Sequence, residues 1–182
     1  MKKLFTLLAL TLSFSMNAQM SDYSSGTAAT GTNAVAMGKS TTASGSYSTA
    51  MGRSTEASGN YSVAMGYSTT ASGSPSTAMG WNTTASGTYA VAMGRETTAS
   101  ATYSTAMGND TTASDYASLV IGQYNSSGSS ATSASSFSTS APAFVIGNGT
   151  DSSSKSDAFK VMFNGDTTVS NDLTVSGDVV IS

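Results

Sequence analysis

The chain has 182 residues, of which 9% are charged, with 7 Lys+Arg against 10 Asp+Glu and a formal net charge of −3. It contains no His and no Cys, which excludes Ser/His/Asp triads, imidazole metal sites and disulfides. The acidic balance does not suit nucleic acid or an anionic membrane as a partner. We therefore expect no enzyme activity, no cofactor and no metal, and no nucleic acid among the partners.

Residues 1–18 have the composition of a secretory signal peptide. Two lysines at positions 2 and 3 precede an apolar run from Leu4 to Phe14, and the segment closes on Ala18. The apolar run is too short to span a membrane. We expect cleavage after Ala18, export to the cell surface or the medium, and no membrane insertion by this chain.

Between residues 24 and 128 one 14-residue unit recurs. Its clearest marker is one large apolar residue per unit, found at Met37, Met51, Met65, Met79, Met93, Met107 and Ile121. A fixed short period indicates a stack of one repeated unit, without an enclosed active site. Runs of about five residues, separated by Gly, favour two short strands per unit and argue against a helix.

Alternation within each run predicts which side chains lie inside a coil. In the unit that begins at Ser62, the residues Ser62, Ala64 and Gly66 share one face, and Val63 and Met65 share the other. A coil of 14 residues is too short to enclose a thick core. We therefore expect the face of small residues inside and the Val/Met face outside, with the second run, residues 69–73, patterned in the same way.

Stacking the units joins their outward apolar residues into one stripe, which for seven coils at ~4.8 Å per strand is about 34 Å long. A continuous apolar stripe on a protein surface usually marks a protein–protein interface. We expect a homo-oligomer that buries this stripe around its axis; the alternative is that Met and Val fill a thicker core within one chain. The expected interface residues are Val35, Met37, Met51, Val63, Met65, Met79, Val91, Met93, Met107, Leu119 and Ile121.

The runs Ser62-Val63-Ala64-Met65-Gly66 and Ala90-Val91-Ala92-Met93-Gly94 resemble the head repeat of trimeric autotransporter adhesins of the YadA type. That repeat reads Asn-Ser-Val-Ala-Ile-Gly, two variable residues, Ser, variable, Ala, variable, Gly. The resemblance implies a left-handed parallel β-roll, a homotrimer, display on a bacterial surface and, often, binding to host matrix proteins such as collagen. This chain departs from the pattern by Met for Ile in six units and by lacking the opening Asn in most.

The remaining residues continue the β pattern less regularly. Residues 129–142 are rich in Ser, Ala and Thr and are expected to form a linker. Residues 143–182 are expected to form a short β-rich segment that loosely resembles the stalks of tail fibres and surface proteins. Within it, residues 143–147 resemble one more coil out of register, and Asn164-Gly165 predicts a hairpin. The chain ends on Ile181-Ser182 within a strand pattern, which indicates an incomplete reading frame or an anchor encoded elsewhere.

One position varies from unit to unit while its neighbours stay constant, as a solvent-facing turn would. It follows the first Gly of each unit and includes Arg53, Tyr67, Trp81 and Arg95. Arg, Tyr and Trp are the residue types that anchor interfaces, so these four are the candidate surface-binding residues. The alternative is an unconstrained loop position.

The sequence therefore predicts an exported, adhesin-like head that attaches to host matrix or to another surface. One alternative is a structural spacer or tail-fibre segment. Another is an ice-binding β-solenoid, although Ser lacks the methyl group that Thr offers on such surfaces. Its candidate surface would be the outward hydroxyl pairs, interrupted by Glu56, at Thr42-Ser44, Thr70-Ser72, Thr84-Ser86, Thr98-Ser100 and Thr112-Ser114.

Overall fold

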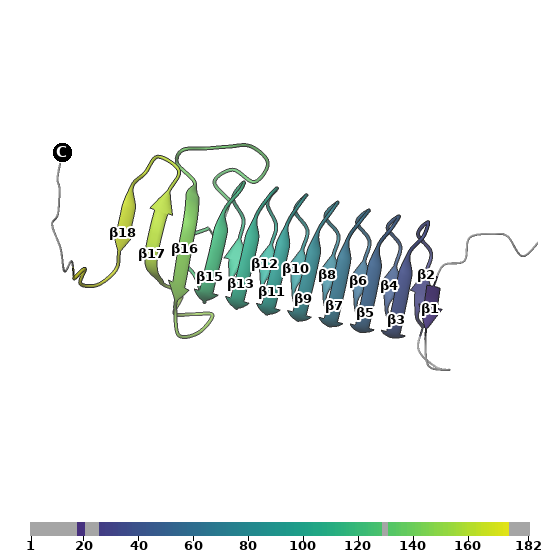
Figure 1. The fold of residues 1–182 in the computed structure, drawn as a ribbon. Coiled ribbons are helices and arrows are strands. Elements are labelled where there is room, and N and C mark those ends of the chain that lie inside the picture. The colour runs from purple at the N-terminus through teal and green to yellow at the C-terminus, as the bar shows by residue number, and fades with distance from the viewer. Residues whose placement is uncertain (1–17, 21–25, 129–130, 175–182) are drawn as a thin grey trace, which may run out of the picture.

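The computed structural model describes residues 18–20, 26–128 and 131–174. All regular secondary structure in this part of the chain is β, and Figure 1 shows the strands stacked in one row from β1 to β18. Of the expected signal peptide, all but Ala18 lies outside the described residues.

Each coil of the repeat contributes one long and one short strand. The long strands are β3 (Val35–Lys39), β5 (Thr49–Arg53), β7 (Val63–Tyr67), β9 (Thr77–Trp81), β11 (Val91–Arg95), β13 (Thr105–Asn109) and β15 (Leu119–Gln123). The short strands are β2 (Ala28–Ala29), β4 (Thr42–Ala43), β6 (Glu56–Ala57), β8 (Thr70–Ala71), β10 (Thr84–Ala85), β12 (Thr98–Ala99) and β14 (Thr112–Ala113). A further strand, β1 (Ala18–Met20), pairs with β3.

The two kinds of strand build two parallel sheets. Within the repeat, long strands pair with long strands of adjacent coils and short strands with short ones, so that each residue lies beside its equivalent 14 residues away. Met65, for example, lies between Met51 and Met79. The predicted all-β solenoid of 14-residue units is confirmed.

Small side chains fill the narrow space between the sheets. The alanine of every long strand from Ala36 to Ala106 is fully buried, as is the alanine of every short strand from Ala43 to Ala113. Thr69 and its equivalents are buried beside them, whereas Val63 and Met65 on the opposite face are half-buried. The predicted inside and outside faces are therefore confirmed for the Ala, Thr, Val and Met columns.

The glycine column at the end of each long strand corrects this prediction. Gly66 is exposed and does not line the core. Its φ of +124° is closed to residues with a side chain, and a Cβ placed there would overlap the carbonyl oxygen of Gly80 in the next coil. Glycine is required at this position because adjacent coils approach closely, and not because the core is thin.

The long-strand sheet continues past the repeat. Three more strands, β16 (Pro142–Asn148), β17 (Asp157–Met162) and β18 (Thr167–Val169), extend it (Figure 1). Although residues 143–147 are out of register in sequence, β16 pairs in parallel with β15 and sets Ile146 beside Ile121. The antiparallel pair β17–β18 confirms the hairpin predicted from Asn164-Gly165.

The Ser-rich segment between β15 and β16 packs back against the roll. The buried carboxylate of Asp115 accepts hydrogen bonds from the backbone N–H groups of Thr132 (2.6 Å) and Ser133 (2.8 Å). The backbone of Tyr116 donates to the carbonyl of Ser133, and that of Thr102 to the carbonyl of Ala134. The described part of this segment is therefore an irregular loop held along two coils, and its extra residues explain how β16 recovers the register.

The short-strand sheet ends at β14, and Asn125 closes it. Its side-chain Oδ1 accepts a hydrogen bond from the backbone N–H of Thr112 (2.8 Å), and its Nδ2 donates to the carbonyl of the same residue (2.9 Å). The carboxamide thus takes the place of a further strand. Where the second sheet ends, Val120 and Val145 replace alanine in the buried column.

We predict that Gly80→Ala destabilises the roll by about 3 kcal/mol or more, because the new Cβ would meet the carbonyl oxygen of Gly94. Gly165→Ala is the matched control: Gly165 also has a positive φ (94°), but open space surrounds it, so about 1 kcal/mol is expected. Chemical unfolding followed by circular dichroism measures both. Equal losses of stability in the two variants would show that the positive φ alone, and not the close approach of the next coil, explains the glycine in each unit.

Candidate functional site

The variable turn column stands at the carboxyl end of the long strands, where pairing keeps its members in line. The residue after each member adopts a left-handed conformation and donates a hydrogen bond to the coil before, as Ser68 N does to Arg53 O (2.9 Å) and Asn82 N to Tyr67 O (2.8 Å). This backbone arrangement fixes the column as a row at one edge of the sheet. Its members are Lys39, Arg53, Tyr67, Trp81, Arg95, Asn109 and Gln123.

The four candidate surface-binding residues form a continuous ladder within this row, which we call the Arg/aromatic ladder. The guanidinium of Arg53 lies 5.4 Å from the ring centre of Tyr67, and Tyr67 stacks on Trp81 with centroids 6.3 Å apart and planes within 8°. Arg95 covers the other face of Trp81 at 5.1 Å. Each contact is a cation–π or stacking interaction, so these exposed side chains hold one another in place.

The ladder places positive charge on an otherwise acidic chain. Arg53 and Arg95 stand at its two ends, with the aromatic rings between them. A carboxylate oxygen of Glu96 lies 3.5 Å from the Arg95 guanidinium, and the Arg95 side chain nevertheless stays 62% exposed. The arrangement offers a flat apolar strip with a cation at each end, which suits a ligand that carries acidic or carbonyl groups about three coils apart.

A second aromatic column was missed by the sequence reasoning. Tyr47 stacks on Tyr61 (5.1 Å, planes within 3°) and Tyr89 on Tyr103 (5.0 Å, 7°) at the turns that precede the long strands. These tyrosines have φ near +60°, at the position where the head repeat opens with Asn. Their recurrence every 14 residues was visible in the sequence. That period is the signal in the sequence that identifies this column.

The expected interface stripe lies between these two aromatic columns, on the outward face of the long-strand sheet. Its Val and Met side chains are half-buried within one chain, and Leu119 is 36% exposed. None of the stripe lies in the fully buried core of the described residues. The hydroxyl pairs considered for ice binding lie on the short-strand sheet, where Thr70 and Thr84 are half-buried and Ser72 and Ser86 are exposed.

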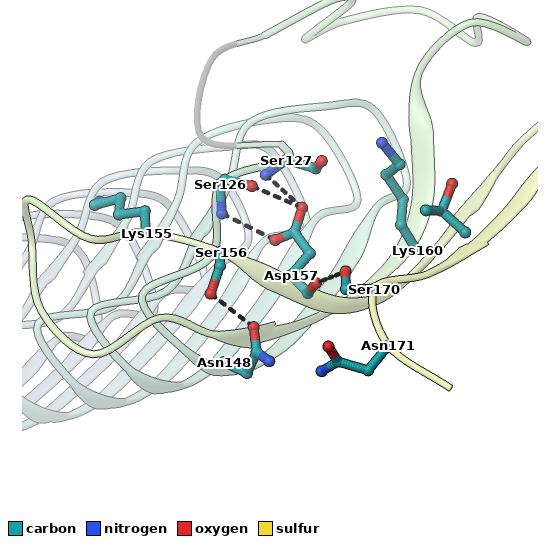
Figure 2. Close-up of a pocket in the computed structure, with 10 residues that line it drawn as sticks. Ser126, Ser127, Asn148, Lys155, Ser156, Asp157, Lys160, Ser170 and Asn171 are labelled. Atoms are coloured by element: carbon teal, nitrogen blue, oxygen red, sulfur yellow. Dashed lines mark hydrogen bonds between the residues drawn. The ribbon is translucent and has the colours of Figure 1, made fainter. Parts of the chain in front are cut away.

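A polar cavity of about 480 Å³ lies where the roll meets the C-terminal strands (Figure 2). Asp157 occupies its centre: Oδ1 accepts from the backbone N–H of Ser126, and Oδ2 accepts from Ser126 Oγ and the N–H of Ser127, all at 2.9 Å. Ser156 Oγ donates to Asn148 Oδ1 (2.7 Å). The contacts of Asp157 connect the roll to the C-terminal strands, and the side chains of Lys155 and Lys160 also line the cavity.

The turn beside this cavity is also internally bonded. Hydrogen bonds from the backbone N–H groups of Ser153 (2.8 Å) and Ser154 (2.9 Å) hold the pKa of the Asp151 carboxyl below its usual range. Lys155 lies 3.5 Å from Asp110 and so connects this turn to the last full coil.

The described residues bring no three His, Cys, Asp or Glu side chains together in a way that could hold a metal ion. In the same part of the chain, no helix has the length and apolar character of a membrane span.

A family model for the YadA head domain repeat, which spans two copies, matches residues 29–55, 43–69, 57–83, 71–97 and 99–125. These matches cover more than half of the chain. The protein belongs to the YadA head-repeat family. A search of curated proteins found no match. The resemblance seen in the sequence is thus confirmed, and so is its parallel β-roll.

Membership of the YadA head family sets the general role of the roll. Heads of this type belong to adhesins of the trimeric autotransporter class; they form trimers, and the family implies display at a cell surface. Members of this family, and β-solenoids of this kind, are typically not enzymes.

We predict that Asp157→Ala loosens the C-terminal strands without unfolding the roll, because it leaves the N–H groups of Ser126 and Ser127 without their acceptor. Limited proteolysis should cut β16–β18 several-fold faster, while the roll resists cleavage. Asp172→Ala, at an exposed position, is the control and should change nothing. Uniform cleavage of roll and C-terminal strands in Asp157→Ala would contradict a local joint.

Proposed function

We propose that this protein is the head of an exported homotrimeric adhesin that attaches a cell to host matrix or to another surface. The observation that carries the proposal is the Arg/aromatic ladder, an exposed and rigid row on a YadA-type roll. Exposed aromatic and Arg side chains are the usual anchors of protein interfaces, and stacking removes much of their conformational freedom before a ligand arrives.

The outward stripe supports assembly into a trimer. Its Val, Met and Ile residues are half-buried in one chain and Leu119 is exposed, so this apolar row would otherwise face solvent along seven coils. Packing that row against two further copies removes its apolar surface from water, which is favourable and needs no thicker core within one chain. The interface we propose therefore consists of the eleven residues from Val35 to Ile121 predicted from the sequence.

A trimer would also multiply weak contacts. Three copies of the ladder on one particle convert a weak single-site affinity into useful avidity when the target surface is repetitive. A matrix protein such as collagen offers such repetition. The alternative of a structural spacer needs no ladder, and the alternative of ice binding would use the Thr face of the short-strand sheet instead.

We predict that Met65→Asp with Met93→Asp disperses the trimer, because each carboxylate would be buried next to its copies. Light scattering coupled to size exclusion should show monomers for this variant and trimers for the unmodified head. The matched control is Thr70→Asp with Thr98→Asp, two half-buried positions on the opposite sheet, which should stay trimeric. A stable monomer of the unmodified head at micromolar concentration would refute the proposed interface.

We predict that Ala at positions 53, 67, 81 and 95 weakens binding to immobilised collagen or host cells at least tenfold. The matched control carries Ala at Lys39, Asn109 and Gln123, which stand in the same column outside the ladder. Surface plasmon resonance on the trimer measures both. Unchanged binding would show that the column is only a loop position. If the trimer binds no surface but slows ice growth, and Thr70→Tyr with Thr84→Tyr abolishes that effect, the ice-binding alternative holds.

A further inference from the structure

The tyrosine column lacks one member in its middle. Positions 61, 75 and 89 are equivalent in three successive coils, since Thr77 pairs with Val63 on one side and with Val91 on the other. Pro75 stands where the flanking coils have Tyr61 and Tyr89. The shorter proline ring leaves a notch between the pairs Tyr47–Tyr61 and Tyr89–Tyr103.

The notch has aromatic walls and an apolar floor. It has a volume of about 200 Å³ and is lined by Tyr61, Pro75, Ser76, Thr77, Tyr89, Ala90 and Val91. Each wall tyrosine stacks on its outer neighbour through one face, which leaves the other face toward Pro75. These walls are accessible, with Tyr61 61% and Tyr89 52% exposed.

The spacing of the walls fits one ring. Stacked tyrosines in adjacent coils are 5.1 and 5.0 Å apart. Two coil steps therefore separate Tyr61 from Tyr89 by about 10 Å, at ~4.8 Å per strand. A ring placed midway would lie about 5 Å from each wall, within the usual range of ~4.5–7 Å for stacked partners.

The chemistry of the lining selects the kind of ring. All seven lining residues are uncharged, so a charged ligand gains nothing here. The hydroxyl of Ser76 is buried below the slot, and like that of the equivalent Ser48 it has no hydrogen-bond partner among the described residues. Thr77 and the tyrosine hydroxyls add further polar groups around an apolar slot.

We propose that this notch binds one pyranose ring of a neutral saccharide. Such a ring has C–H faces that pack on tyrosine and a rim of hydroxyls that Thr77 and the tyrosine hydroxyls can meet. An aromatic side chain shares the apolar faces but lacks the hydroxyl rim. The site is separate from the Arg/aromatic ladder, which lies at the other edge of the long-strand sheet, so it adds a second specificity to the head.

The test measures saccharide binding by the assembled head, because Val91 belongs both to the notch and to the proposed trimer interface. Maltohexaose, cellohexaose and N-acetylchitohexaose are each titrated and followed by saturation-transfer NMR. Pro75→Tyr restores the residue that the neighbouring coils use and fills the notch; Tyr89→Ala removes one wall. Trp81→Ala, an aromatic loss at the opposite edge, is the control, and N-acetyltryptophanamide is the competing aromatic probe.

We expect millimolar binding of at least one saccharide, weakened tenfold or more by Pro75→Tyr and by Tyr89→Ala and unchanged by Trp81→Ala. The variant with Ala at positions 53, 67, 81 and 95 should also retain it, so failure of matrix binding and failure of this site are distinguishable. The proposal is overturned if none of the three saccharides binds or if Pro75→Tyr leaves binding unchanged. It is also overturned if only the tryptophan derivative occupies the notch.

Discussion

Two parallel sheets pack against each other through small side chains, mainly alanine and threonine, and the other features of the molecule depend on how closely the sheets lie. Ala64 and Ala71 are fully buried, and any larger residue between them would push the sheets apart along every adjacent coil. Because the core consists of small side chains, each chain buries little apolar surface within itself. The larger apolar residues, such as Val63 and Met65, therefore lie outside, where another copy can cover them.

The pairing register between coils determines which side chains line up on the surface of the roll. Because each residue lies beside its equivalent in the next coil, one choice at one position in the unit becomes a row on the surface. Like charges in adjacent coils, such as Lys39 and Arg53, repel, whereas an Arg beside an aromatic ring is attracted to it, as Arg53 is to Tyr67. The tyrosines at φ near +60° follow the same logic, since stacking of Tyr47 on Tyr61 offsets part of the backbone cost of that conformation.

The period and the Ala/Met alternation were sufficient to predict the solenoid, its inside and its outside. The exposed Gly66 column could not be placed from alternation alone, because the strand turns there and the reason for glycine lies in the next coil. The recovery of register at β16 was equally hidden: it depends on Asp115 holding a distant loop and on Asn125 ending one sheet. For the candidate site, the variable position in the repeat predicted the exposed Arg/aromatic column. The cation–π and stacking contacts between its members depend on side-chain orientation, which the repeat pattern does not give. The tyrosine column is harder to predict, because its residues occupy turn positions, where an exposed side chain is ordinary.

Every pair of adjacent coils in the repeat makes the same backbone pairing, so the number of coils can change without changing how two coils pack. Gain or loss of one 14-residue unit would change its reach by about 4.8 Å and leave every sheet contact of the same kind. Loss of residues 69–82 would remove Pro75 and Trp81 together. It would also place Tyr61 beside Tyr89, and Tyr67 beside Arg95, in adjacent coils. Unequal recombination within the repeat could therefore alter how far the head projects and what it recognises in a single step, with no need to evolve a new core.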